Sequence, residues 1–459
     1  MTFFKKNGLN IVVAGCDTIG YSIIEQLSHE GHNITVVDKN PENLARIEAN
    51  FDVQTICGTC ASFSVLKNAD VASADIFIAV TGNDEKNILS CVLAKQIGNP
   101  DTIAAVVDTD YGFDRESLKA RLGISTIVNP ALECSKEINK MLSLPKDIEV
   151  EDFAHGGARL VKFKVDNSFP FLNMAVKDIR NCTKSEVIFC SVDREGKIII
   201  PNGDFVFKAG DEVLFVSSAK NSVEFFKELG YSNFQSKNVL IIGGGRVAYC
   251  LCQKLSEHNI KHTVIEKETA RCDLLSRKFP KTDIIHGDVT DEKTLLDAGI
   301  KSSDAIVCVT HNDEINLLTT FYAKHISNAK CITKVDKGSF NSVITDLNIG
   351  SIVVPKELFC EKVIAFVRAK YNSRGSNLRM LYYLFNKRAV AMEFAITDVS
   401  KCTNKPIKNL NFKNGIIIAS ITRNGSFILP NGNDEIKVGD SIIVVSSIID
   451  IKCLDDILR

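Results

Sequence analysis

Residues 238–248 read NVLIIGGGRVA, a short apolar run that leads directly into three consecutive glycines. An apolar run followed by the spacing G-x-G-x-x-A is typical of a buried parallel strand that turns into a helix. In this pattern Gly243 permits the tight turn, Gly245 lets the backbone approach a pyrophosphate, and Ala248 allows the helix to pack closely on the strand. The stretch therefore predicts a Rossmann-like, doubly wound α/β domain with a nucleotide site at the turn.

The same pattern occurs earlier in the chain, where residues 10–20 read NIVVAGCDTIG. The offset between the two copies is 228 positions from Gly15 to Gly243 and 229 positions from Thr81 to Thr310. An offset this constant indicates internal duplication, because chance recurrence of a motif would not keep its spacing. The chain therefore holds two nucleotide pockets that can be compared residue by residue.

Each copy begins with short apolar segments that alternate with amphipathic helical segments. In the first copy we expect strands at 9–14, 33–37, 53–57, 76–80 and 102–107, and helices at 19–29, 41–49, 63–68, 84–96 and 114–122. Continuous apolar strands are typical of strands buried on both faces. Their alternation with helices predicts right-handed crossovers and a parallel sheet.

The second part of each copy has short alternating strands separated by turn residues. The turns at Pro201 and Gly210 recur at Pro430 and Gly439, in each case 229 positions later. This pattern of short strands and turns is typical of a small, mainly β domain. We expect Rossmann-like domains at 1–130 and 232–355, and a linker helix plus a small mainly β domain at 131–231 and 356–459.

Composition excludes several classes of protein. The 55 basic and 56 acidic residues nearly cancel, so nothing favours nucleic acid as a ligand. No apolar run approaches the roughly 18–20 residues that span a bilayer. Lysines precede an apolar run near Met1, as in a signal peptide, but that run is a strand entering a glycine turn, so we expect a cytosolic protein without a signal peptide.

The chain contains fifteen cysteines, which we expect to be reduced and mostly buried. Cys57 and Cys60 form its one C-x-x-C motif. A structural zinc site would require a second pair at matching spacing, and none is present. Redox chemistry stays open, because the pair falls at a strand-to-helix junction, but the second copy has no cysteine there.

The second copy has the full set of residues for a nucleotide pocket. The helix start after the glycines offers unpaired N–H groups to phosphate oxygens, and Arg246 adds a positive charge there. Glu266 ends the next strand, where a carboxylate accepts hydrogen bonds from ribose hydroxyls and repels the 2′-phosphate of NADP. The predicted contacts before the fifth strand are Gly243, Gly244, Gly245, Arg246, Val247, Glu266, Asp288, Thr310 and His311.

The first copy departs from this set. Asp17 replaces the glycine that faces the pyrophosphate, and its carboxylate would crowd and repel a phosphate. Thr59 stands where the second copy has Asp288, whereas Asp38 keeps the ribose position. The corresponding candidate residues are Gly15, Cys16, Asp17, Thr18, Ile19, Asp38, Thr81 and Gly82. We expect the second pocket to bind nucleotide normally and the first to be impaired, limited to an adenosine moiety.

Both copies carry a further polar element after the fourth strand, at 81–85 and 310–314. It follows the carboxyl end of a strand, where doubly wound folds bind ligands. The Asn-Asp pairs at 83–84 and 312–313 are equally well explained as helix N-caps. Thr81 and Thr310 are therefore the better candidates for ligand contact.

In the order of these motifs the chain resembles the RCK (KTN) regulatory domains, and in its tandem arrangement it resembles the peripheral nucleotide-binding subunits of Trk potassium uptake systems. The resemblance covers essentially all 459 residues. It implies a protein that binds NAD(H) or the adenine nucleotides ATP and ADP. It also implies a cytosolic homo-oligomeric ring, a tetramer, at the inner face of the cell membrane. Such subunits gate a membrane potassium translocation subunit and are not enzymes.

The resemblance also implies a phosphate-binding cation on the fifth strand, where the family often has arginine. Lys334 holds that position in the second copy, and Ala105 holds it in the first. A lysine has a shorter reach and lacks the forked geometry of arginine. This comparison again favours the second pocket.

Two other functions remain open from the sequence. An NAD-dependent oxidoreductase needs a group that moves a proton beside the nicotinamide. Tyr383 and Lys387 have the spacing of a short-chain dehydrogenase pair, although they fall outside the sheet domains. A soluble nucleotide sensor without a membrane partner is the other alternative. The linker helices at 131–144 and 357–370 have apolar faces suited to packing between subunits, but packing within their own domain explains them equally well.

Overall fold

The computed structural model describes residues 8–107, 115–143, 148–153, 158–167, 169–230, 236–336, 350–372, 378–385, 388–448, 451 and 453–459. The chain forms two compact units. The parallel-sheet unit comprises Met1–Asn139 and Lys237–Val367, and the antiparallel-sheet unit comprises Lys140–Ser236 and Arg368–Arg459. Each unit thus takes one part from each sequence copy, so the units do not coincide with the two halves of the chain.

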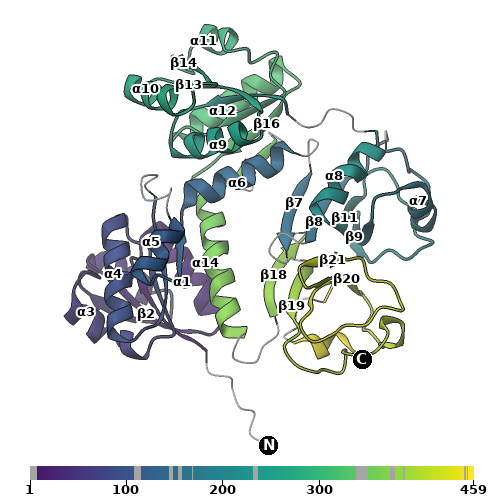
Figure 1. Cartoon of the computed structure of the whole chain (residues 1–459), viewed down its shortest axis with the longest axis horizontal. Coiled ribbons are helices and arrows are strands. Elements are labelled where there is room, and N and C mark those ends of the chain that lie inside the picture. The colour runs from purple at the N-terminus through teal and green to yellow at the C-terminus, as the bar shows by residue number, and fades with distance from the viewer. Residues whose placement is uncertain are drawn as a thin grey trace, which may run out of the picture. The chain divides into compact units, whose positions relative to one another are not determined.

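The first copy contributes a six-stranded parallel sheet in the order β3-β2-β1-β4-β5-β6 (Figure 1). Its strands are β1 (Asn10–Ala14), β2 (Asn33–Asp38), β3 (Gln54–Cys57), β4 (Ile76–Ala79), β5 (Asp101–Ala105) and β6 (Thr126–Val128). Its helices are α1 (Thr18–His29), α2 (Pro41–Glu48), α3 (Phe63–Asn68), α4 (Asp84–Ile97) and α5 (Arg115–Leu122). The predicted Rossmann-like fold is confirmed. The sixth strand was not predicted, because three residues are too few to carry a periodic signal.

The second copy repeats this topology in the order β14-β13-β12-β15-β16-β17. Its strands are β12 (Asn238–Ile242), β13 (Lys261–Glu266), β14 (Asp283–His286), β15 (Ala305–Cys308), β16 (Lys330–Lys334) and β17 (Ser351–Val353). Its helices are α9 (Arg246–Glu257), α10 (Thr269–Lys278), α11 (Glu292–Asp297) and α12 (Asp313–Ile326). The order reverses between the first and fourth strands of each sheet, and ligands of doubly wound folds bind at such a reversal.

The antiparallel-sheet unit contains two five-stranded sheets, in the orders β10-β9-β11-β8-β7 and β18-β19-β22-β20-β21. The first contains β7 (Glu149–Phe153), β8 (Ala158–Lys164), β9 (Val187–Arg194), β10 (Lys197–Ile199) and β11 (Glu212–Ser217), with α7 (Val176–Cys182) and α8 (Ala219–Glu228). The second contains β18 (Leu378–Leu384), β19 (Ala389–Ala395), β20 (Ile416–Arg423), β21 (Ser426–Ile428) and β22 (Ser441–Ser446). These are the small, mainly β domains that the turn pattern predicts.

A buried arginine–aspartate pair fixes the Gly-Asp turn of each small domain. Arg194 donates from Nε and Nη2 to the two carboxylate oxygens of Asp211, each at 2.7 Å, and the N–H of Lys208 donates to the same carboxylate at 2.8 Å. Arg423 and Asp440 repeat the pair at 2.8 Å. Asp211, the second residue of the Gly-Asp turn, is 1% exposed, so these hydrogen bonds fix the turn from within the buried part of the domain. The duplicated turns therefore have a structural cause.

The two antiparallel sheets share one apolar core, to which Leu160 and Ile188 contribute from the first copy and Ala391 and Ile443 from the second. At its edge, Arg388 forms an ion pair with Asp193 and donates to the carbonyl of Gly196 at 2.5 Å. Arg388 thus ties a turn of the second small domain to β9 and its hairpin in the first.

The linker helices α6 (Pro130–Leu142) and α14 (Pro355–Asn372) belong largely to the parallel-sheet unit. Phe359, Val363 and Val367 of α14 are fully buried within this single chain, which favours packing within the chain, one of the two alternatives, for this helix. Glu133 of α6 and Lys362 of α14 approach to 3.9 Å. None of the helices described has both the length and the apolar character needed to cross a membrane.

A few expectations fall on residues that the structure does not describe. They are the first residue of the helix expected at 114–122, the C-terminal end of the linker helix expected at 131–144, and Lys387. Tyr383 lies on β18 in the antiparallel-sheet unit.

Substitution of Asp211 by alanine tests the buried pair of the turn. Loss of this carboxylate leaves the half-buried guanidinium of Arg194 and the N–H of Lys208 without their acceptor. We expect the free energy of unfolding to fall by about 2–3 kcal/mol, measured by urea denaturation. Asp204 is the matched control, because it pairs with Lys177 at the same 2.7 Å but in full exposure. Asp204→Ala should cause no measurable change, and equal losses in the two variants would contradict this account.

Candidate nucleotide site

The turn after the first strand of each parallel sheet requires glycine. Gly15 has φ +98° and Gly243 has φ +97°, a left-handed conformation that other residues rarely adopt. A Cβ on Gly15 would lie 2.9 Å from backbone atoms of Val80 and Thr81, and one on Gly243 would lie 3.0 Å from Thr310. The two copies therefore make the same turn for the same reason, and the fourth strand closes it from the other side.

The third position of the motif follows a different rule. Gly245 and Asp17 both have extended backbone, with φ −75° and −68°. A Cβ on Gly245 would meet no protein atom within 4 Å. The protein's own packing therefore does not require glycine at position 245. The remaining reason for a glycine is that a side chain there would occupy the space of a ligand. Asp17 fills the same place in the first copy with an exposed carboxylate that makes no capping hydrogen bond to α1.

The acidic residue at the end of the second strand holds the glycine turn by its backbone. Asp38 accepts from the N–H of Cys16 at 2.9 Å and of Asn40 at 2.8 Å. Glu266 accepts from the N–H of Gly244 at 2.6 Å, and from the N–H groups of the next two residues, each at 2.8 Å. Glu266 is only 6% exposed, so it faces the loop more than open space. Its Oε2, with one described donor, retains a lone pair for a ribose hydroxyl.

A buried asparagine in each copy anchors the threonine after the fourth strand. The side chain of Asn316 accepts from the N–H and hydroxyl of Thr310 at 2.9 and 2.7 Å, and donates to the carbonyls of Thr310 and Lys334 at 3.1 and 3.0 Å. Asn87 makes the same four bonds to Thr81 and Ala105. The threonine hydroxyls, favoured from the sequence as ligand contacts, thus already donate within the protein. We call this arrangement the asparagine latch.

The neighbouring polar residues divide into two roles. Asn83 and Asn312 accept from the N–H groups of Lys86 and Ile315 at 2.8 Å, so they are N-caps as the sequence indicated. Asp313 instead accepts from the N–H of Asp336 at 2.9 Å, as Asp84 does from the N–H of Val107. These two aspartates tie the start of the fourth helix to the end of the fifth strand, a role that the sequence did not reveal.

The charged candidates of the second copy are placed as follows. Lys334 is buried at the end of β16 and forms an ion pair with Asp336. Arg246 is exposed at the start of α9, and Val247 behind it is buried. His311 is exposed after β15. Asp288 is exposed, and hydrogen bonds from the N–H and hydroxyl of Thr290 lower its pKa.

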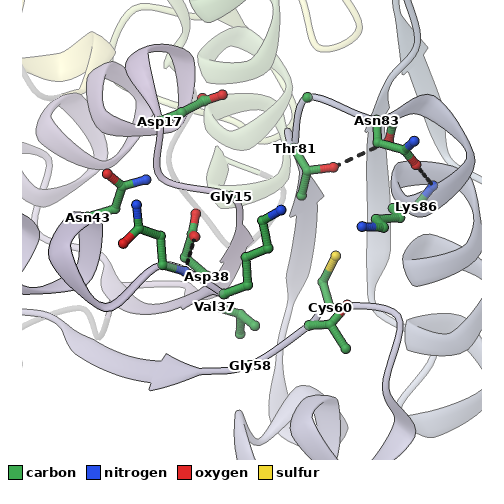
Figure 2. Close-up of a pocket in the computed structure, with 14 residues that line it drawn as sticks. Gly15, Asp17, Val37, Asp38, Asn43, Gly58, Cys60, Thr81, Asn83 and Lys86 are labelled. Atoms are coloured by element: carbon green, nitrogen blue, oxygen red, sulfur yellow. Dashed lines mark hydrogen bonds between the residues drawn. The ribbon is translucent and has the colours of Figure 1, made fainter.

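The first copy encloses a cavity of about 310 Å³ at its topological switch point (Figure 2). Pockets for small molecules span roughly 300–1,000 Å³, so this one suits a compact ligand. Its lining residues come from the ends of β1 and β2, the starts of α1, α2 and α4, and the segments after β3 and β4. They are Gly15, Asp17, Val37, Asp38, Lys39, Asn40, Asn43, Gly58, Thr59, Cys60, Thr81, Gly82, Asn83 and Lys86.

Sequence reasoning found five of the fourteen residues that line this cavity. Of the eight candidates in the first copy, five border the cavity, whereas Cys16, Thr18 and Ile19 are not among its lining residues. Two lysines were missed, Lys39 and Lys86. A signal for Lys86 was present, since the duplication aligns it with Ile315, and an apolar residue replaced by a cation beside a predicted pocket marks a changed site.

The thiols near this cavity are poorly suited to redox chemistry. Burial raises the pKa of Cys60, which lines the cavity, and burial next to Asp38 raises the pKa of Cys16 to about 12. A thiol reacts as its thiolate, so both groups are held in the unreactive form at neutral pH. Cys57, the other half of the C-x-x-C motif, is exposed.

The asparagine latch can be tested by comparing two substitutions in one motif. Asn316→Ala leaves the buried N–H of Thr310 and carbonyl of Lys334 without partners, and each such group costs about 1–3 kcal/mol. We expect a loss of about 2–4 kcal/mol in the free energy of unfolding. Asn312→Ala removes only an N-cap and should cost about 1 kcal/mol. Chemical denaturation monitored by circular dichroism distinguishes the two, and a larger loss for the cap variant would contradict the latch.

Two domain families match the chain, and each matches it twice. The TrkA-N domain matches residues 11–130 and 239–355, and the TrkA-C domain matches residues 160–230 and 391–458. The TrkA-N matches alone span more than half of the chain. The four matched ranges lie within the four domains that the sequence predicts.

Relatives of known name match over nearly their whole length. The Trk system potassium uptake protein TrkA homolog of Archaeoglobus fulgidus is 28% identical over 98% of this chain and 100% of its own. The Trk system potassium uptake protein TrkA of Halomonas elongata is 26% identical over 98% of both chains. Among solved structures, the GsuK RCK domain has a TM-score of 0.61 at 16% identity, covering 97% of this chain and 93% of its own. The GsuK channel bound to NAD has a TM-score of 0.62 at 16% identity, covering 97% and 78%. The structural likeness shows a shared RCK fold, and the duplicated TrkA-N and TrkA-C matches show that the chain belongs to the TrkA family.

Proposed function

We propose that this protein is the cytosolic regulatory subunit of a potassium uptake system. In this proposal it binds NAD(H) or the adenine nucleotides ATP and ADP, and gates a membrane potassium translocation subunit by a change of conformation. The names of its relatives from Archaeoglobus fulgidus and Halomonas elongata support potassium uptake as the process. Their agreement over nearly complete chains supports transfer of the role as a whole.

The observation that carries the nucleotide assignment is the empty space at Gly245. The left-handed turn at Gly243 leads into the start of α9 beside this space, and α9 is a regular helix of 12 residues. Its first N–H groups and the positive end of its dipole favour a phosphate there. Arg246, the first residue of α9, is exposed and supplies a forked, permanently charged donor beside Gly245.

The nature of the ligand follows from Glu266 and its surroundings. Glu266 lies at the strand end beside Gly244, the place where a carboxylate receives the hydroxyls of an adenosine ribose in doubly wound folds. Its charge disfavours a 2′-phosphate, which supports NAD(H) over its phosphorylated counterpart. The related RCK fold of GsuK has been solved with NAD bound, which supports the same class of ligand here.

The proposed mechanism is a shift between two conformations. A ligand moves such an equilibrium only by binding one state more tightly than the other. In the second copy, a phosphate that reaches Lys334 competes with Asp336 for its ammonium group, and Asp336 is tied through its N–H to the start of α12. Ligands with phosphate chains of different length would therefore differ in how far they weaken the Lys334–Asp336 ion pair at the end of β16.

The same proposal covers assembly and the absence of catalysis. We infer a homo-oligomeric ring, a tetramer, held at the inner face of the cell membrane by the translocation subunit. The oxidoreductase alternative would need a proton-transfer group beside the nicotinamide. Its one sequence candidate, Tyr383, belongs to β18 in the antiparallel-sheet unit, outside both parallel-sheet domains. We therefore favour a regulator that does not turn over its nucleotide.

Substitution of Gly245 by aspartate tests the assignment by copying the first-copy residue into the second copy. Since a Cβ at 245 meets no protein atom, the variant should keep its thermal stability. We expect at least a tenfold loss of affinity for NAD⁺ or NADH by calorimetry, and loss of nucleotide-dependent regulation of potassium uptake in cells that lack the native chain.

Gly203→Asp in the antiparallel-sheet unit is the control, since a Cβ there has ordinary contact with Lys177 at 3.7 Å. It should bind and regulate normally. Unchanged nucleotide affinity in Gly245→Asp would refute the site, whereas lost affinity with unchanged uptake would refute the regulatory role.

A further inference from the structure

The two copies share the glycine turn but distribute charge differently around it. We infer that the first-copy cavity is a second ligand site with its own specificity. It selects a ribonucleoside that carries one compact anionic group, such as a 5′-monophosphate, with the anion beside Lys86 instead of at the glycine turn. This goes beyond the proposed function, which concerns the second-copy site.

The glycine-turn side of the first pocket has fewer cations than the same side of the second, although Arg46 lies near Cys16 there. Three cations of the second copy are replaced by neutral residues at the aligned positions, namely Arg246 by Thr18, Arg271 by Asn43 and Lys334 by Ala105. The same side has gained the carboxylate of Asp17, which borders the cavity. Two negative charges about 4 Å apart repel by roughly 1–4 kcal/mol at surface dielectric, so a pyrophosphate at this turn is disfavoured.

The opposite side of the cavity has gained a cation. Lys86 lies on the first turn of α4, and Figure 2 shows its side chain directed into the space between α4 and the strand ends. In the described part of the chain its ammonium group has no ion-pair partner. Lys86 and Cys60 both line the cavity, and the lysine's positive charge partly offsets the rise that burial causes in the pKa of the Cys60 thiol. Lys39 borders the same space, and the second copy keeps a lysine there, Lys267. What distinguishes the first copy is therefore Lys86.

The groups that would hold a ribose remain in place. Asp38 borders the cavity and accepts one N–H bond on each carboxylate oxygen, from Cys16 and Asn40. Each oxygen thus retains a lone pair for a sugar hydroxyl. Asn43, in the first turn of α2, adds an amide to the same wall.

This arrangement of charges determines which chemical groups the ligand needs and how large it can be. A hydroxylated sugar meets Asp38, and a single anionic group meets Lys86 on the far side, at a distance from Asp17. A volume near 310 Å³ accommodates a nucleoside monophosphate more readily than a dinucleotide. The first-copy site is thus altered and not defective. The substitutions at its glycine turn change which ligand it selects.

The test uses the full chain with Gly245→Asp, which disables the second-copy site and leaves the first as the binding site. Calorimetric titrations with AMP, adenosine, ribose 5-phosphate and NAD⁺ give the affinities. We expect AMP to bind at least tenfold more tightly than adenosine or NAD⁺, and ribose 5-phosphate to separate recognition of the sugar phosphate from recognition of the base.

Lys86→Ile in that chain introduces the residue that the second copy carries, so the variant should fold. It should lower AMP affinity about tenfold or more and leave adenosine affinity unchanged. Lys67→Ile, at an exposed lysine of α3 away from the cavity, should alter neither. Equal affinities for AMP and adenosine, no AMP binding at all, or equal AMP affinities in the Lys86 and Lys67 variants would each overturn the inference.

Discussion

The left-handed glycine that ends the first strand of each parallel sheet is the constraint on which the rest of the site depends. Gly15 and Gly243 have the same φ within a degree, and the fourth strand lies so close that no side chain fits at either position. Because the turn is fixed, the next helix must start at the switch point of the sheet. The acidic strand ends then bind the turn through its N–H groups. The position and direction of the helix, and the partial positive charge at its N-terminus, all follow from this one backbone conformation.

This constraint separates what the fold requires from what a ligand requires. The first glycine of the motif is demanded by the backbone in both copies. The third is not, since Asp17 adopts the same extended conformation that Gly245 has. The residue at the third position can therefore vary without changing the turn. Duplication followed by such variation can produce two sites of different specificity in one chain, and the exchange of Ile315 for Lys86 fits that pattern.

Much of the fold could be predicted because buried parallel strands are unbroken apolar runs. The strands around Val12 and Leu240 and the helix at Phe63–Asn68 were predicted to within a residue or two. The three-residue strands β6 and β17 were missed, since so short a segment has no periodicity. Other gaps come from contacts distant in sequence. The pairing of Arg194 with Asp211 and the asparagine latch join residues whose meeting depends on the finished sheet.

The candidate site was predictable where its residues belong to a motif, and less so where they do not. The glycine turn and the strand-end acids follow from their spacing. Lys86 and Asn43 do not, because their relevance depends on which helix turns face the cavity. Attention to the fifth strand, where Ala105 replaces Lys334, indicated a missing cation. The alignment of Lys86 with Ile315 already marked a changed charge in the sequence, but only the cavity showed that Lys86 borders the same pocket.

The central claim is that the two copies, although each makes the same glycine turn, bind different ligands. Equilibrium dialysis of the unmodified chain with labelled NAD⁺, with and without AMP at the concentration that half-saturates the first-copy site, tests it most directly. The account predicts one NAD⁺ per chain, which stays bound at that AMP concentration. Two equivalent NAD⁺ sites per chain, or complete displacement of NAD⁺ by AMP, would contradict it.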